Sequence, residues 1–155
     1  MKFKIDKANI INEFQSLAAV ADKKQTLPIL SNILIRCDVG EIRMLSTDLE
    51  VELEVVLDGQ SVEAPGETTI PAKKAADIIR ELPEGEVSFS LSDESSKLTV
   101  KSSSGRYNLS TIPGSDFPDF DVVKNEEVHT ISTEKLRELF HKTSFQWQIK
   151  TGATT

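Results

Sequence analysis

The amino-acid sequence predicts an α+β fold with mainly antiparallel sheets and two helices. Short runs in which apolar and polar residues alternate, as in half-buried strands, are interrupted by two segments whose apolar residues recur at helical spacing. Most connections between the predicted strands are too short for the crossover that parallel strands require. The length of 155 residues is sufficient for one domain with its own hydrophobic core.

The first helix is predicted over residues 7–22, with Asp6 as its N-cap. Its apolar residues fall at helical spacing, and they are Ile10, Ile11, Phe14, Leu17, Ala18 and Ala21. Strands are then expected at residues 29–36 and 42–45. A further strand is expected over residues 50–55, where valine and leucine would face a core and the three glutamates would face water.

The second helix is predicted over residues 72–82, after a short strand at residues 68–70. Pro71 lies between them and suits the entry to a helix. Three more strands follow at residues 87–91, 97–102 and 106–110. The resulting order of strands and helices is typical of an α+β unit.

Basic residues gather on one face of the second predicted helix. Lys73 and Arg80 are seven positions apart and share this face, with Lys74 alongside and Asp77 between them. Such a face suits contact with a phosphate backbone without reading of sequence. The alternative is an ordinary solvated face on which Lys73 pairs with Asp77.

A later part of the chain repeats the pattern of an earlier part at a constant separation of 126 positions. The corresponding pairs are Ile5 and Ile131, Ile10 and Leu136, and Phe14 and Phe140. We therefore expect one complete domain over residues 1–120, an acidic linker over residues 121–127, and the opening of a second, similar domain over residues 128–155.

Composition excludes several classes of protein. The formal net charge of −7 is unusual for a protein that coats DNA, although it leaves room for local basic surface. The single cysteine, Cys37, excludes an internal disulfide and a cysteine-rich metal cluster. The chain shows no signal-peptide pattern and no apolar run of membrane-spanning length, so we expect a cytoplasmic protein without membrane association.

Catalysis is the alternative function that the sequence leaves open. Four acids, Asp48, Glu50, Glu52 and Glu54, could hold magnesium in an enzyme that acts on nucleic acid. Even-numbered positions of a strand project to one face at about 7 Å spacing, which favours a solvated sheet surface instead. The two histidines, His129 and His141, have no organised nucleophile nearby in the sequence. We expect no catalysis, no metal and no cofactor.

Seven segments together resemble one protein family. They are Met1–Phe3, Thr26–Asn32, Ser46–Glu50, Thr69–Lys74, Leu82–Gly85, Leu109–Pro113 and Asp116–Pro118. In this order and spacing they resemble the bacterial sliding clamp, the β subunit of DNA polymerase III. The resemblance extends from residue 1 to about residue 145.

The resemblance implies a DNA-clamp (processivity) fold and a role as a processivity factor in DNA replication. In that family each chain has three similar domains, and two chains close a ring around double-stranded DNA. The implied partners are DNA, a second clamp chain, the clamp loader and DNA polymerase III. The implied DNA-contacting residues are Lys24, Lys73, Lys74 and Arg80. The implied dimer-interface residues are Arg106, Tyr107 and Leu109.

The resemblance ends after Phe145, and residues 146–155 differ from the family. Back-translated codons for these residues, with one G restored, encode Ala-Met-Ala-Asn-Gln-Asp, which resembles the family's continuation. We therefore expect a one-base deletion followed by premature termination, which sequencing of the locus would check. The family's peptide-binding pocket lies in the later domains, so the resemblance implies that this fragment neither closes a ring alone nor binds partner peptides.

Overall fold

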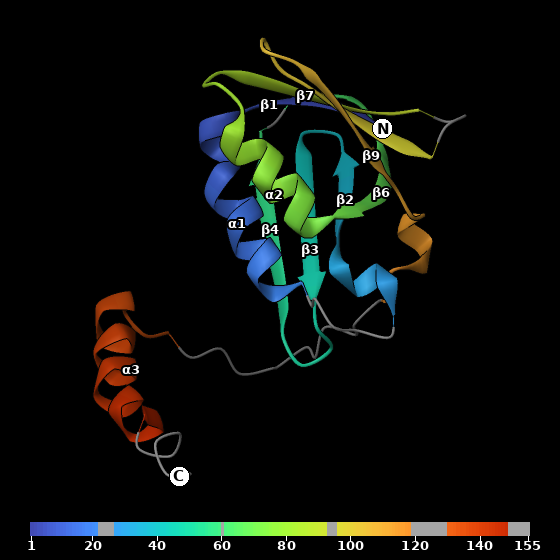
Figure 1. Cartoon of the computed structure of the whole chain (residues 1–155). Helices are drawn as coiled ribbons and strands as arrows, with labels where there is room; N and C mark the ends of the chain where they lie inside the picture. Colours follow the sequence, from blue (N-terminus) through green and yellow to red (C-terminus); the bar gives the residue numbers. More distant parts are fainter. Residues whose placement is uncertain (22–26, 60, 93–95, 119–129, 149–155) are drawn as a thin grey trace. The chain divides into compact units, whose positions relative to one another are not determined.

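The computed structural model of the chain describes residues 1–21, 27–59, 61–92, 96–118 and 130–148, except for the side chains of residues 144–148 (Figure 1). The chain divides into two compact units, Met1–Asp119 and Phe120–Thr155. The predicted linker at 121–127 lies outside the described residues, and the predicted domain boundaries stay predictions. No described helix is long and apolar enough to cross a membrane.

The first unit contains two antiparallel sheets. The five-stranded sheet has the order β5-β1-β7-β8-β9, built from β5 (Ser61–Ala64), β1 (Lys2–Asp6), β7 (Glu86–Ser92), β8 (Lys97–Lys101) and β9 (Arg106–Ser110). The four-stranded sheet has the order β4-β3-β2-β6, built from β4 (Glu52–Asp58), β3 (Glu41–Thr47), β2 (Asn32–Asp38) and β6 (Gly66–Pro71). Every pair of neighbouring strands is antiparallel, which confirms the predicted α+β class.

Two α-helices of this unit, α1 (Ile11–Val20) and α2 (Ala72–Glu81), pack against each other and against the four-stranded sheet (Figure 1). Short 3-10 helices lie at η1 (Lys7–Asn9), η2 (Pro28–Ser31) and η3 (Gly114–Asp116). Asp6 is an N-cap, as predicted, but the prediction of one helix over residues 7–22 was wrong. Its carboxylate accepts a hydrogen bond from Ala8 N at 2.9 Å and caps η1, so the α-helix begins only at Ile11.

The predicted strand at residues 50–55 begins two residues later than expected. The Asp48 carboxylate accepts hydrogen bonds from the backbone N–H groups of Glu50, at 3.0 Å, and Val51, at 2.7 Å, so residues 48–51 form a turn. This turn places Leu49 at φ 75° and leaves Val51 54% exposed. The expectation that Val51 faces a core was therefore wrong.

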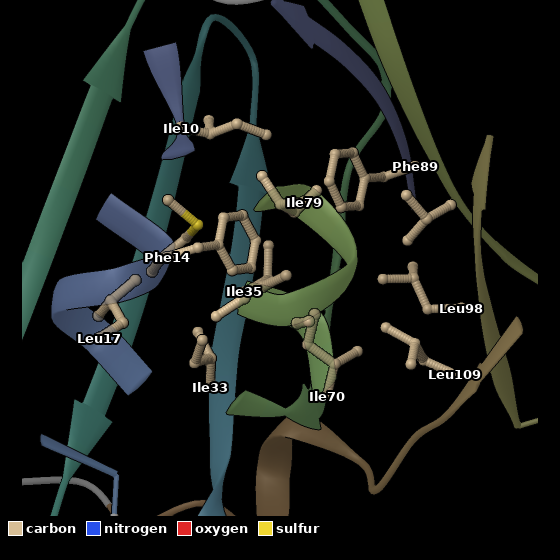
Figure 2. Packing of buried hydrophobic residues seen from close by; sticks show 14 of the residues in the cluster. Ile10, Phe14, Leu17, Ile33, Ile35, Ile70, Ile79, Phe89, Leu98 and Leu109 are labelled. Carbon is tan, nitrogen blue, oxygen red and sulfur yellow. The ribbon is translucent and has the colours of Figure 1, made fainter. Parts of the chain in front are cut away.

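One hydrophobic core lies between the helices and both sheets. Figure 2 shows that Ile35 and Ile70 of the four-stranded sheet, Ile79 of α2 and Phe89 of the five-stranded sheet contribute side chains to this core. The Phe89 ring stacks on Phe3 with centroids 4.6 Å apart. Phe14 and Leu17 of α1, with Ala75 and Ile79 of α2, complete this core. The opposite face of α2 is therefore turned to solvent.

The second unit contains helix α3 (Thr133–Gln148). All of its described side chains, residues 133–143, are exposed. Among them are three large apolar ones, Leu136, Leu139 and Phe140. This helix lies where the pattern of the first predicted helix repeats, and the identity of this segment as the start of a second domain stays a prediction.

Candidate functional site

Helix α2 carries the basic surface that the sequence predicted. One side of the helix is buried in the core through small and branched apolar residues, which are Ala72, Ala75, Ala76 and Ile79. Lys73, Lys74 and Arg80 are all exposed. The alternation of buried and exposed positions at helical spacing therefore directs the three basic side chains away from the core.

The three basic residues of α2 differ in their ion pairs. Arg80 lies 3.2 Å from Asp77 Oδ1 and 3.2 Å from Glu81 Oε1, so two carboxylates already neutralise its guanidinium group. Among the described residues, no carboxylate lies within ion-pair distance of Lys73 or Lys74. The alternative ion pair between Lys73 and Asp77 is not formed, and Asp77 pairs with Arg80 instead. Within the described part of the chain, the two ammonium groups therefore have no carboxylate partner and can meet an anion.

The fourth predicted DNA-contacting residue, Lys24, lies outside the described residues. The structure therefore describes three of the four residues that are predicted to contact DNA, and all three belong to helix α2. The role of each of the four in DNA contact stays a prediction.

The residues predicted for a dimer interface lie on β9, at the edge of the five-stranded sheet. Arg106 is exposed and Tyr107 is 38% exposed. Leu109 is only 5% exposed, and Figure 2 shows it among the core residues beside Leu98. Leu109 thus offers a partner little side-chain surface, and strand β9 would meet a partner mainly through its backbone edge and Tyr107.

Two of the four acids of the catalytic alternative have structural roles or ion-pair partners. Asp48 holds the turn before β4, and Glu54 pairs with Arg43 at 3.2 Å. Within the described part of the chain, no group of three or more His, Cys, Asp or Glu residues could hold a metal ion. Burial raises the pKa of the Cys37 thiol to about 12, which makes it a poor nucleophile. His129 lies outside the described residues.

Comparison with known proteins identifies the family. Residues 1–121 match the family model of the DNA polymerase III beta subunit, N-terminal domain. The chain is 39% identical over 147 residues to the beta sliding clamp of Pseudomonas aeruginosa, covering 94% of this chain and 39% of that protein. It is 34% identical over 146 residues to the beta sliding clamp of Escherichia coli, with the same two coverages.

Solved structures give the same result. The Pseudomonas aeruginosa sliding clamp bound to griselimycin superposes with a TM-score of 0.87 at 36% identity, covering 94% of this chain and 39% of that one. The Caulobacter crescentus sliding clamp gives a TM-score of 0.87 at 31% identity with the same coverages. This chain thus spans about 39% of the length of the relatives it matches. The chain belongs to the DNA polymerase III beta subunit family, and its residues 1–121 correspond to that family's N-terminal domain.

Proposed function

We propose that this chain is part of a DNA polymerase processivity factor, a sliding clamp of bacterial DNA replication, and that α2 contacts double-stranded DNA. The observation that carries the proposal is the pair of lysines, Lys73 and Lys74, exposed and without an ion pair among the described residues, in a chain of the clamp family. Arg80 is a weaker contact because Asp77 and Glu81 compete for its charge.

The proposed contact is electrostatic and independent of DNA sequence. Lysine is a flexible point charge, and phosphate contacts position a protein without reading bases. Each phosphate neutralised contributes about −0.9 to the slope of log affinity against log salt concentration. Two or three such contacts, with Lys24 as a third, hold DNA weakly. We therefore assign the retention of the clamp on DNA to the closed ring and not to these contacts.

The remaining activities of a whole clamp belong to the same proposal. A second clamp chain would join at the β9 edge near Arg106 and Tyr107, and the clamp loader and DNA polymerase III would be the further partners. A solved Helicobacter pylori clamp, 27% identical, is bound to a DNA ligase peptide. This chain matches about 39% of its relatives, so ring closure and peptide binding are assigned to the remaining part of the clamp. The setting would be the bacterial cytoplasm, and the role non-catalytic.

The proposal is tested by DNA binding at low salt. Fluorescence anisotropy of a short labelled duplex would compare the chain with the double variant Lys73→Ala/Lys74→Ala. A matched control is Lys97→Ala/Lys101→Ala, which removes two exposed lysines from the five-stranded sheet. We expect the α2 variant to weaken binding and to make the log–log salt slope shallower by about 1.8. Equal losses in both double variants would contradict the proposed contact.

The catalytic alternative has its own test. A nuclease assay with magnesium would compare the chain with Asp48→Ala, the residue that holds the turn before β4. We expect no magnesium-dependent cleavage in either protein. Cleavage that is lost in Asp48→Ala would favour the enzyme.

A further inference from the structure

We propose that Asp77 limits the strength of the DNA contact of α2, because it holds the guanidinium group of Arg80 on the helix surface. Asp77 is a positioning residue, which acts on DNA through Arg80. Its removal would turn Arg80 into a full phosphate contact. This role rests on the proposed function, since it concerns the same face of α2, and it adds a residue that opposes DNA binding to those that favour it.

Asp77 lies in the middle of the exposed face of α2. Residues three and four positions apart are neighbours on the surface of a helix. Asp77 therefore lies one turn after Lys73 and Lys74. By the same spacing it lies one turn before Arg80. A carboxylate in this position disfavours DNA, because it repels the phosphate backbone and attracts the cations that would bind it.

Of its three cationic neighbours, Asp77 pairs with Arg80. Asp77 Oδ1 lies 3.2 Å from Arg80 Nη2, whereas neither lysine of α2 forms an ion pair with a described residue. An acid that precedes its basic partner along a helix is favoured over the reverse order, because this order agrees with the helix dipole. Arg80 also lies in the last turn of α2, where a cation is stabilised. The choice of partner thus leaves the two lysines available.

The ion pair occupies the part of Arg80 that would bind a phosphate. Arginine binds phosphate best through two parallel N–H groups of its planar guanidinium. Asp77 contacts Nη2 and Glu81 contacts Nε, each at 3.2 Å. Within the described part of the chain, Nη1 alone has no carboxylate partner, so a bidentate contact to phosphate requires an ion pair to break. Without Asp77, both terminal nitrogens are available.

The ion pair is weak enough to exchange with a phosphate. The side chains of Arg80 and Asp77 are 55% and 48% exposed, and exposed ion pairs contribute little because water and salt screen them. Asp77 therefore does not prevent a contact between Arg80 and DNA but reduces what binding gains from it. In a clamp that is retained by its ring, weak contacts of this kind leave the protein free to slide.

The test removes the charge of Asp77 with little change of side-chain shape, in the variant Asp77→Asn. Glu63→Gln is the matched control. It also removes one carboxylate of an exposed ion pair, here with Lys2 at 2.6 Å, and it changes the net charge equally. Circular dichroism and urea denaturation would verify that both variants fold. Fluorescence anisotropy of a labelled duplex over a series of salt concentrations would compare them with the parent chain.

We expect Asp77→Asn to tighten duplex binding at low salt by about two- to fivefold, the range that an exposed ion pair of this type spans. The slope of log affinity against log salt concentration should become steeper by about 0.9, because Arg80 then neutralises one more phosphate. Asp77→Glu, which keeps an acid one turn before Arg80, should behave like the parent chain. A slope that changes as much in Glu63→Gln as in Asp77→Asn would overturn the role of Asp77.

A double-mutant cycle separates the release of Arg80 from the simple loss of a negative charge near DNA. We expect Arg80→Gln to have little effect in the parent chain and to abolish the gain in the Asp77→Asn background. A gain that persists in the double variant Asp77→Asn/Arg80→Gln would overturn the positioning role, because the missing charge alone would then explain it.

The side-chain Nε–H signal of Arg80 in NMR spectra gives a second readout. The chain has five arginines, so this signal can be assigned by its loss in Arg80→Gln. We expect added duplex to shift it more in Asp77→Asn than in the parent chain. Equal shifts in the two proteins would contradict the release of Arg80.

The lysine variant of the proposed function distinguishes failure of this role from failure of the DNA contact itself. If Lys73→Ala/Lys74→Ala weakens binding and Asp77→Asn gains nothing, the role of Asp77 is overturned and the DNA contact of α2 stands. If Lys73→Ala/Lys74→Ala binds as well as the parent chain, the DNA contact of α2 is overturned, and the role of Asp77 with it.

Discussion

The Nζ atom of Lys7 lies 2.6 Å from the carbonyl oxygen of Leu82, so a buried lysine closes the C-terminal end of α2. The same ammonium group lies 3.1 Å from Glu84 Oε1, and Lys7 N donates to Gly85 O at 3.0 Å. Three contacts thus fasten η1 to the turn that follows α2. The helix that carries Lys73 and Lys74 is anchored by this turn at its far end.

Replacing Lys7 with methionine removes the ammonium group and keeps most of the side-chain length. The Leu82 carbonyl would lose its buried donor, and we expect the free energy of unfolding to fall by about 1–3 kcal/mol. Urea denaturation followed by circular dichroism measures the change. Lys101→Met, at an exposed position of β8, should stay within about 0.5 kcal/mol of the parent chain. A negligible effect at Lys7 would show that the buried contact adds no net stability.

Phe89 is the centre of the aromatic packing in the core. It is 1% exposed, stacks on Phe3 and has its ring centroid 6.2 Å from that of Phe14. We expect Phe89→Ala to cost about 3–5 kcal/mol in unfolding free energy, because burial is lost and a cavity remains. Thermal and urea unfolding provide the measurement. Phe140→Ala, at a 66% exposed position of α3, serves as the control and should have little effect.

Much of this fold could be predicted from adjacent residues. Strand β9 has the predicted bounds, β8 and α2 differ from theirs by one residue at one end, and β7 differs by one residue at each end. Their alternation of apolar and polar side chains directly reflects burial on one face. The start of β4 could not be predicted in this way, because the side chain of Asp48 binds two backbone N–H groups and competes with the strand.

The candidate site was only partly predictable for a related reason. Helical spacing placed Lys73, Lys74 and Arg80 on the exposed side of α2. The ion pair that the sequence suggested, Lys73 with Asp77, does not form, because Arg80 pairs with Asp77. The burial of Leu109 depends on which face of β9 meets the core, and that follows from strand order in the sheet.

The raised pKa of the buried Cys37 thiol predicts that the stability of the protein depends on pH. Burial raises its pKa from 9.0 to about 12, so the folded state keeps the proton that the unfolded state releases. The contribution is fully present below pH 9 and is lost as the pH rises toward 12. We expect this group to lower the unfolding free energy by about 1.4 kcal/mol per pH unit in that window.

Urea midpoints measured just above pH 9 would show this effect as a difference between the parent chain and Cys37→Ala. The alanine variant lacks the thiol, so its stability should fall less steeply with pH, whatever its stability at neutral pH. All other ionisable side chains are the same in both proteins, so their contributions cancel in the comparison. Parallel pH profiles would contradict the shifted thiol pKa.

The backbone conformation of Leu49 predicts that a glycine variant at this position is more stable than an alanine variant, the reverse of the usual order. Its φ of 75° is strained for a residue with a Cβ atom. We expect Leu49→Gly to be more stable than Leu49→Ala by about 1 kcal/mol. At Val51, which ends the same turn, the usual order should hold, with alanine more stable than glycine by about 0.4–1 kcal/mol. Chemical denaturation of the four variants tests this; the same order at both positions would refute it.

The most direct test of the DNA contact is a titration of the isotopically labelled chain with a short duplex at low ionic strength, followed by amide NMR spectra. We predict that the largest chemical-shift changes fall on α2 around Lys73 and Lys74, that they do not depend on duplex sequence, and that added salt reverses them. Changes concentrated on the β strands, with the α2 amides unmoved, would contradict the account.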